Sequence, residues 1–279
     1  MASNKPIFIM SRSDMCGFIP LSLSHCTAIS MGSFLFARFL FSPTATVILF
    51  VTCLIILFVR GAVALVSGGK DSVYSLHLAL WQGFDIKAVG IVIPPPDSLV
   101  FQHENVRFAE VHARALGLPV LFSQSGIGES SEIAALCNIF RAARTKYCAE
   151  WVVVGALCSD YQRVRFNYPA ADLGMKIHTP IWHVDPCKYL ENLVRDGFEF
   201  IITKVAAEGL DRSWLGRRIT EENLDDLLSL ADRHSFNPAG EGGEYESFVV
   251  KTPLYAVDVR GVVKGNRFVI EEVYLSDTG

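Results

Sequence analysis

The stretch "ALVSGGKDSVYSLHLAL", residues 64–80, decides the fold. The apolar residues 62–66 are typical of a strand that is buried on both faces. Gly68 and Gly69 then permit a tight turn, and from Ser72 onward apolar residues recur at helical spacing. A strand, a glycine turn and a helix start direct free backbone N–H groups at one place. The stretch therefore predicts an anion site, and phosphate is the anion that fits best.

The polar residues of this block strengthen the phosphate prediction. Lys70 adds a full positive charge, and Ser67 and Ser72 add hydroxyl donors. The block has neither Walker A nor G-x-G-x-x-G spacing, and the alternative is an ordinary turn whose glycines serve only packing. We expect the phosphates of a nucleotide to be held by Ser67, Gly68, Gly69, Lys70, Asp71 and Ser72.

Strand-like and helix-like segments alternate along the chain as far as residue 206. The expected strands are residues 62–66, 86–93, 118–123, 151–156 and 198–206, and the expected helices after the first are residues 104–117, 130–149 and 220–234. This order predicts an α/β fold with a mainly parallel sheet flanked by helices, and ligands bind at the carboxyl ends of such strands. The tail alternates like antiparallel strands around a turn at 264–266, which predicts a smaller C-terminal α+β region.

Composition narrows the class of protein. The chain has 279 residues, of which 51% are hydrophobic, so it can bury a large core. Residues 1–58 carry a formal charge of +2, so the total of −4 leaves −6 on the rest, which argues against nucleic-acid binding. The seven cysteines form no C-x-x-C pair, which favours reduced thiols in a cytoplasmic protein over zinc or iron–sulfur ligation.

The N-terminal region differs from the rest. Residues 39–59 contain no charged side chain and are long enough to span a bilayer. Only two residues separate this run from the strand before the glycine turn, so a membrane anchor is the alternative and not the first expectation. We expect residues 1–58 to be an extension outside the functional protein, residues 59–177 to be the nucleotide-binding domain, and residues 178–279 to be the smaller substrate-binding region.

Two further motifs carry candidate chemistry. "GALCSDYQRVR" (155–165) follows an expected strand, so its polar residues should reach the same sheet edge as the glycine turn. Its arginines could pair with a phosphate or a carboxylate, and a capped helix start with solvated arginines is the alternative. "GEGGEYES" (240–247) is acidic and suits a cation; a solvated hairpin loop is the alternative.

These motifs carry a resemblance to a known family. The 67–72 block resembles the loop of the adenine nucleotide α-hydrolase (N-type ATP pyrophosphatase, or PP-loop) superfamily. The other two motifs look like signatures of the diphthine–ammonia ligase family, and residues 97–120 are similar to the corresponding family stretch. One departure lies there, because His103 stands one position later than the family's Phe-His pair would put it. The resemblance covers residues 59–276 and implies a HUP-like fold.

The resemblance implies an ATP-dependent ligase that forms an amide bond. Its substrate would be diphthine, a modified histidine on translation elongation factor 2 that bears a trimethylammonium group and a carboxylate. The carboxylate would be adenylated and then amidated by ammonium, giving diphthamide, AMP and pyrophosphate in the last step of diphthamide biosynthesis. The alternatives are another PP-loop enzyme, such as a tRNA-modifying one, and a sensor module that binds ATP without chemistry.

The reaction requires residues that hold the pyrophosphate leaving group and neutralise its charge, and this requirement assigns the roles of the candidate residues. The expected catalytic residues are Lys70, Asp71, Asp160 and Arg163, and Mg²⁺ would be bound by Asp71 and Asp160. The expected substrate-binding residues are Ser159, Gln162, Arg165, Glu241, Glu244, Tyr245 and Glu246.

Overall fold

Strand β1 (Arg60–Leu65) is the centre of the fold in a computed structural model that describes residues 60–94 and 105–276. After Arg60 every residue of β1 is buried, as expected for a strand covered on both faces. Its neighbours give a five-stranded sheet of order β3-β2-β1-β4-β5, in which every pairing is parallel. The other strands are β2 (Phe84–Ile93), β3 (Val120–Gln124), β4 (Trp151–Val153) and β5 (Lys176–His178).

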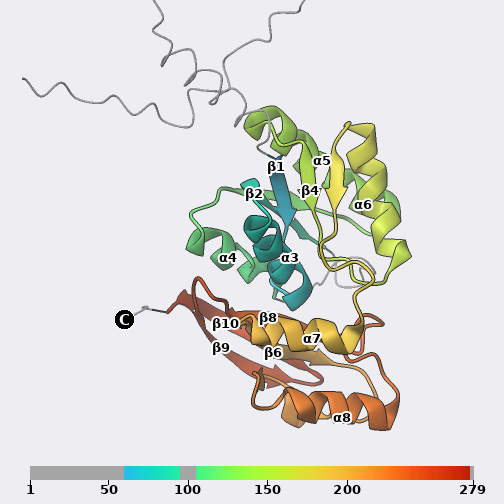
Figure 1. The fold of residues 1–279 in the computed structure, drawn as a ribbon, viewed down its shortest axis with the longest axis vertical. Helices are drawn as coiled ribbons and strands as arrows, with labels where there is room; N and C mark the ends of the chain where they lie inside the picture. Colours follow the sequence, from blue (N-terminus) through green and yellow to red (C-terminus); the bar gives the residue numbers. More distant parts are fainter. Residues whose placement is uncertain (1–59, 95–104, 277–279) are drawn as a thin grey trace, which may run out of the picture. The chain divides into compact units, whose positions relative to one another are not determined.

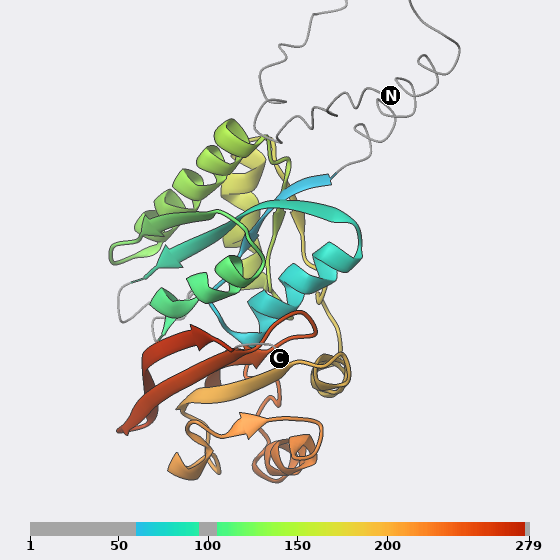
Figure 2. The same ribbon diagram turned by 90° about the vertical axis from the view of Figure 1, so that its left-hand side faces the viewer.

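Helices cover both faces of this sheet (Figures 1 and 2). Helices α3 (Lys70–Trp81) and α4 (Glu110–Ala115) lie on one face, and α5 (Glu129–Tyr147) and α6 (Asp160–Asp172) lie on the other. Alternate residues of β1 belong to different cores, since Ala64 packs in the α3 cluster and Val63 packs in the α5 cluster. The predicted α/β sheet flanked by helices is confirmed.

The second sheet is antiparallel and forms the C-terminal region seen in the lower part of Figure 1. Its order is β7-β6-β10-β9, and β8 pairs with β6. The strands are β6 (Glu199–Val205), β7 (Arg218–Ile219), β8 (Tyr245–Lys251), β9 (Val257–Lys264) and β10 (Arg267–Leu275), and the helices are α7 (Pro186–Arg195) and α8 (Leu224–His234). Residues 265 and 266 make the hairpin turn between β9 and β10, so the expected α+β region is confirmed.

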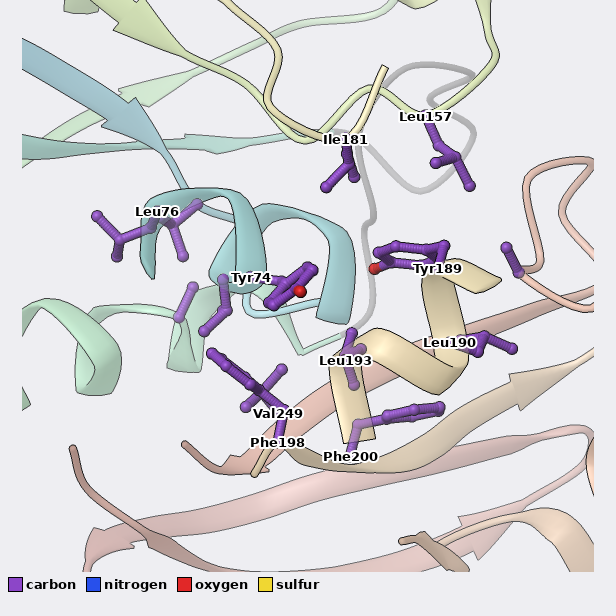
Figure 3. Close-up of a cluster of buried hydrophobic side chains, with 14 of the residues drawn as sticks. Tyr74, Leu76, Leu157, Ile181, Tyr189, Leu190, Leu193, Phe198, Phe200 and Val249 are labelled. Atoms are coloured by element: carbon purple, nitrogen blue, oxygen red, sulfur yellow. The ribbon is translucent and has the colours of Figure 1, made fainter. Parts of the chain in front are cut away.

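One hydrophobic core joins the two sheets. Figure 3 shows Tyr74 of α3 facing Tyr189 and Leu193 of α7, with Phe200 of β6 beneath them, while Leu76 lies on the opposite side of α3. All five side chains are buried. Because apolar burial stabilises by about 25 cal/mol per Å², this shared core holds α3 and the second sheet together.

Three expected elements are shorter by three or more residues in the structure, and one of them is the helix expected over 220–234, which begins at Leu224. The helix expected over 104–117 is a 3₁₀ turn at Val106–Phe108 followed by α4, because Asn105 has a φ of 65° and its amide bonds the backbone of β10. The strand expected over 151–156 ends at Val153, where the chain turns toward the start of α3.

The apolar run at 39–59 lies outside the described residues. Within 60–94 and 105–276, none of the helices has the length and apolar character needed to cross a membrane.

Two buried histidines, His77 of α3 and His112 of α4, make the fold sensitive to acid. His112 is fully buried and its Nδ1 lies 3.0 Å from the Tyr255 hydroxyl. Burial, and secondly the nearby His77, lower the pKa of His112 from 6.5 to about 3. The folded state therefore keeps this imidazole neutral while the unfolded state protonates it, so stability falls as pH drops below 6.5 toward 3.

We predict that protonation of His112 in the unfolded state lowers the free energy of unfolding by about 2 kcal/mol between pH 7.5 and pH 5. Urea unfolding at both pH values measures this loss of unfolding free energy. In His112→Phe the loss should be smaller than in wild type by about 2 kcal/mol. His234→Gln, at an exposed position, should keep the wild-type pH dependence. An equal loss in wild type and His112→Phe would contradict the prediction.

Candidate active site

A cleft of about 400 Å³ opens at the carboxyl ends of β1, β2 and β4. The first sheet and the 67–72 turn form one wall, and β6 and the 240–246 loop form the other. Seven of the predicted site residues line it: Ser67, Asp71, Ser72, Gln162, Glu241, Tyr245 and Glu246. The other predicted site residues are not in this lining: Gly68, Gly69, Lys70, Ser159, Asp160, Arg163, Arg165 and Glu244.

The glycine turn is fixed from the side of the second sheet. Gly68 has a φ of +85°, and an added Cβ would come within 2.7 Å of the Phe248 ring. Its carbonyl accepts a hydrogen bond from the Val249 N–H at 2.9 Å. The hydroxyls of Ser67 and Ser72 lie 3.2 Å apart at the cleft. The turn therefore presents its two hydroxyls to the cleft and Gly68 to β8.

Lys70 is buried and connects two parts of the site. Its side chain is 3% exposed, and its ammonium donates to the Ala239 carbonyl at 2.6 Å and to the Asp71 carboxylate at 3.1 Å. The hydroxyl of Tyr189 donates to Oδ1 of Asp71 at 2.7 Å, and the Lys70 ammonium lies 3.1 Å from this oxygen as well. In this arrangement the Lys70 ammonium faces the 237–246 loop. Its role in neutralising a phosphate stays a prediction.

Gly155 allows β4 to meet α3. A Cβ at Gly155 would lie 2.6 Å from the carbonyl of Asp71 and 2.6 Å from the nitrogen of Ser72. Both contacts are to backbone, so no side-chain rotation could relieve them. Gly155 also lines the cleft, and it brings the chain after β4 directly against the start of α3.

The acidic loop contributes two of its three carboxylates to the cleft. Glu241 accepts the Cys158 N–H at 3.2 Å, and Glu246 pairs with Lys204 at 3.2 Å. Glu244 instead accepts the Asn237 N–H at 3.3 Å within its own loop. Tyr245 lines the cleft, and its ring centroid lies 5.0 Å from the Lys70 ammonium. The loop therefore supplies negative charge and an aromatic face beside the turn.

The 159–165 motif sits at the start of α6, where Ser159 caps the helix by accepting the Gln162 N–H at 3.3 Å. Gln162 lines the cleft, whereas Asp160 is 75% exposed and pairs with Arg163 at 3.3 Å. Arg163 lies over Trp182, and Arg165 pairs with Glu129 at 2.7 Å. The structure thus brings Gln162 into the cleft and turns both arginines toward other protein groups.

Metal ligation was predicted for Asp71 and Asp160. Within the residues that the structure describes, three or more His, Cys, Asp or Glu side chains do not gather into a metal-binding cluster. Magnesium is commonly held by one or two carboxylates and by substrate phosphates, and Asp71 at the cleft has the right chemistry for that arrangement.

Lys204 and Phe166 are among the lining residues that were not singled out from the sequence. Phe166 stands one helical turn after Gln162, at a spacing that would have placed both on one face of α6. Lys204 is a charged residue after the apolar run "FII" in the segment "FEFIITKVA", and such an interruption is a usable signal.

Glu241 offers a test of the electrostatics of the cleft. Burial, and secondly the negative charge of Asp71, raise the pKa of Glu241 above its ordinary value of 4.5. The folded state therefore holds the proton more tightly than the unfolded state, so this group reduces stability as pH rises above that value.

We predict that Glu241→Gln has a higher Tm than wild type at pH 8, and that the difference disappears as pH falls below about 4.5. Thermal unfolding across this range measures it. Glu221→Gln, at an exposed position, should follow the wild-type curve throughout. A Glu241→Gln variant that is less stable than wild type at pH 8 would contradict this electrostatic account.

A glycine turn at the carboxyl edge of a parallel sheet is typical of nucleotide-binding α/β proteins. Family models identify the particular family. Residues 60–177 match the diphthamide synthase N-terminal domain, and residues 185–273 match the diphthamide synthase C-terminal domain. The chain therefore belongs to the diphthamide synthase family, as the sequence motifs predicted.

Curated relatives agree with this membership. The chain is 32% identical to the diphthine–ammonia ligase of Rattus norvegicus over 69% of this chain and 79% of that protein. It is 30% identical to the Danio rerio enzyme of the same name, with 69% and 83% covered. The Schizosaccharomyces pombe enzyme is 32% identical, and the chain spans about a third (34%) of its length.

A solved structure also shows a weak similarity. It is the crystal structure of a 4-thiouridine synthetase–RNA complex with bound ATP, with a TM-score of 0.34 and 14% identity over 69% of this chain and 55% of that chain. Similarity at this level says nothing about the ligands of the present chain.

Proposed function

We propose that this chain is an ATP-dependent diphthine–ammonia ligase. It converts the diphthine carboxylate on translation elongation factor 2 to the amide of diphthamide, using ammonium and releasing AMP and pyrophosphate. The observation that carries the proposal is the match to both diphthamide synthase domains, since these two segments also supply the two walls of the cleft. The rat and zebrafish relatives of this architecture bear the name diphthine–ammonia ligase.

The first wall suits the phosphates of ATP. The start of α3 and the hydroxyls of Ser67 and Ser72 lie at the cleft, where the positive end of the helix dipole favours an anion. The Ser72 hydroxyl donates to the Gly69 carbonyl in this structure, so a phosphate that binds there would replace that hydrogen bond. The charged side chains among the described lining residues are Asp71, Glu241, Glu246 and Lys204, a formal charge of −2. Asp71 is the residue at the turn that would hold Mg²⁺, and the ion would supply the positive charge that a triphosphate needs there.

The reaction divides into two substitutions. An oxygen of the diphthine carboxylate attacks the α-phosphorus of ATP, and the bond to pyrophosphate breaks. Ammonia then attacks the activated carbonyl, and AMP leaves with its electron pair. No covalent enzyme nucleophile is required, so the work of the residues is to position the reactants and to balance charge.

The acidic wall suits the cations of the reaction. Glu241 and Glu246 attract ammonium and the trimethylammonium group of diphthine, and Tyr245 adds an aromatic ring. Glu241 is also the natural acceptor for the proton that ammonium must lose, because burial raises its pKa above the ordinary value. Within this proposal residues 59–177 bind ATP, residues 178–279 bind the diphthine side chain, and Lys70, Asp160 and Arg163 support the chemistry.

The proposal also includes the protein partner and the cellular location of the enzyme. The protein partner is elongation factor 2 carrying diphthine, and a cytoplasmic location follows from that substrate. Nucleic acid is not part of the reaction.

The test uses the full chain with ATP, ammonium chloride and elongation factor 2 that carries diphthine. We expect AMP and diphthamide to form in equal amounts, measured by chromatography and by the mass of the modified histidine peptide. Omission of ammonium should stop amide formation, and a factor with unmodified histidine should stop AMP formation. AMP formed without the factor, or ATP bound and never cleaved, would overturn the proposal.

A further inference from the structure

Lys204 occupies a special position in the second sheet. In the pairing of β6 with β8, Ile202 lies opposite Ser247 and Lys204 lies opposite Glu246, so the register shifts at Thr203. Such a bulge redirects the side chains that follow it, and bulges are frequent beside active sites. Lys204 and Glu246 consequently lie on the same face, where both line the cleft.

Lys204 is the cationic side chain of the cleft lining among the described residues. Its ammonium is 3.2 Å from Glu246, and its side chain is 27% exposed, so it can be reached from the cleft. The other candidate cations have different partners, because Lys70 is buried against Ala239 and Arg165 pairs with Glu129. An anion that enters the cleft therefore meets Lys204.

The position of Lys204 in the cleft indicates which anion binds to it. Ser67 and Ser72, the residues expected to meet the phosphates, lie in the turn after β1 and at the start of α3, whereas Lys204 projects from the second sheet. Its neighbour Glu246 uses one oxygen for Lys204, and its other oxygen is buried with no hydrogen-bond partner in the described part of the chain. A fixed ammonium beside a carboxylate matches a zwitterion that has one charge of each sign.

Resting on the proposed function, we propose that Lys204 and Glu246 form the subsite for the zwitterionic end of diphthine. Lys204 binds the substrate carboxylate before adenylation, and Glu246 faces the trimethylammonium group. The substrate carboxylate takes the place of Glu246 at the Lys204 ammonium, so the internal ion pair keeps the subsite organised while it is empty. Specificity for diphthine then comes from binding both its carboxylate and its trimethylammonium group.

The experiment compares Lys204→Met, Lys204→Arg and Lys251→Met in the full chain with wild type. Lys251 is a matched control, because it lies on β8 and pairs with Glu199 at 2.7 Å but does not line the cleft. Initial rates give the KM for diphthine-bearing elongation factor 2 and the KM for ATP separately, and Tm shows whether each variant is folded.

We expect Lys204→Met to raise the KM for the diphthine-bearing factor at least tenfold while the KM for ATP stays within twofold. Lys204→Arg keeps the charge, so its KM for the diphthine-bearing factor should lie between those of wild type and Lys204→Met. Lys251→Met should have the wild-type KM values. An increase in the KM for ATP instead would assign Lys204 to a phosphate and overturn the inference, and so would unchanged constants in both Lys204 variants. Wild type that fails to amidate the factor would overturn the proposed function itself, which is a separate outcome.

Discussion

Gly155→Ala should reduce AMP formation at least a hundredfold. The added methyl group would lie 2.6 Å from backbone atoms of Asp71 and Ser72, a distance that forces β4 and α3 apart. Overpacking of this kind costs about 1–3 kcal/mol. A displacement of about 1 Å between reacting groups is enough to lose two orders of magnitude in rate. Factor-dependent AMP release and thermal unfolding measure the two effects.

Gly61→Ala is the matched control. Gly61 lies in β1 of the same sheet, and its added Cβ would meet the nearest atoms, in Cys148 and Lys87, at an ordinary 3.5 Å. We expect this variant to keep its activity and to change stability by no more than about 0.5 kcal/mol. Wild-type activity in Gly155→Ala would mean that the contact between β4 and α3 does not shape the active site.

The second large effect is expected for Lys70→Met. This change removes a buried ammonium and leaves the Asp71 carboxylate and the Ala239 carbonyl without it. Breaking a buried pair in this way costs about 3–5 kcal/mol, because the remaining charge is left uncompensated. We therefore expect a large drop in unfolding free energy in urea together with the loss of AMP formation.

The double variant Lys70→Met/Asp71→Asn separates stability from chemistry. With both charges removed, the uncompensated carboxylate is gone, and the Tyr189 hydroxyl can still donate to the amide oxygen of the side chain that replaces Asp71. Most of the lost stability should return, while AMP formation should stay absent. A double variant with wild-type AMP formation would show that neither residue takes part in the reaction.

The sequence predicted the fold well because the signals were local. Apolar runs such as residues 62–66 and 86–93 are short, rich in β-branched residues and bounded by glycine or proline, which is typical of buried central strands. The two motifs after β1 and β4 meet at one edge because parallel strands end on the same side. The strand after residue 151 was predicted too long, because the tight approach of Gly155 to α3 is a tertiary contact.

Side-chain direction within the site could not be predicted in the same way. Lys70 faces Ala239, which is 169 residues away in sequence, so its orientation depends on how the second sheet packs. Arg163 and Arg165 were expected at the ligand, but Trp182 and Glu129 lie beside them instead. The sequence marks Lys204 by its charge within an apolar segment, but the direction of its side chain depends on the register shift against β8, which is a tertiary feature.

The central claim is that the diphthine carboxylate attacks the α-phosphorus of ATP in the cleft between the two sheets. Diphthine labelled with ¹⁸O in its carboxylate tests this directly, because the attacking oxygen stays on phosphorus when the amide forms. Mass spectrometry should find one ¹⁸O in the AMP and none in the pyrophosphate. Label in inorganic phosphate together with ADP, or unlabelled AMP, would contradict the account.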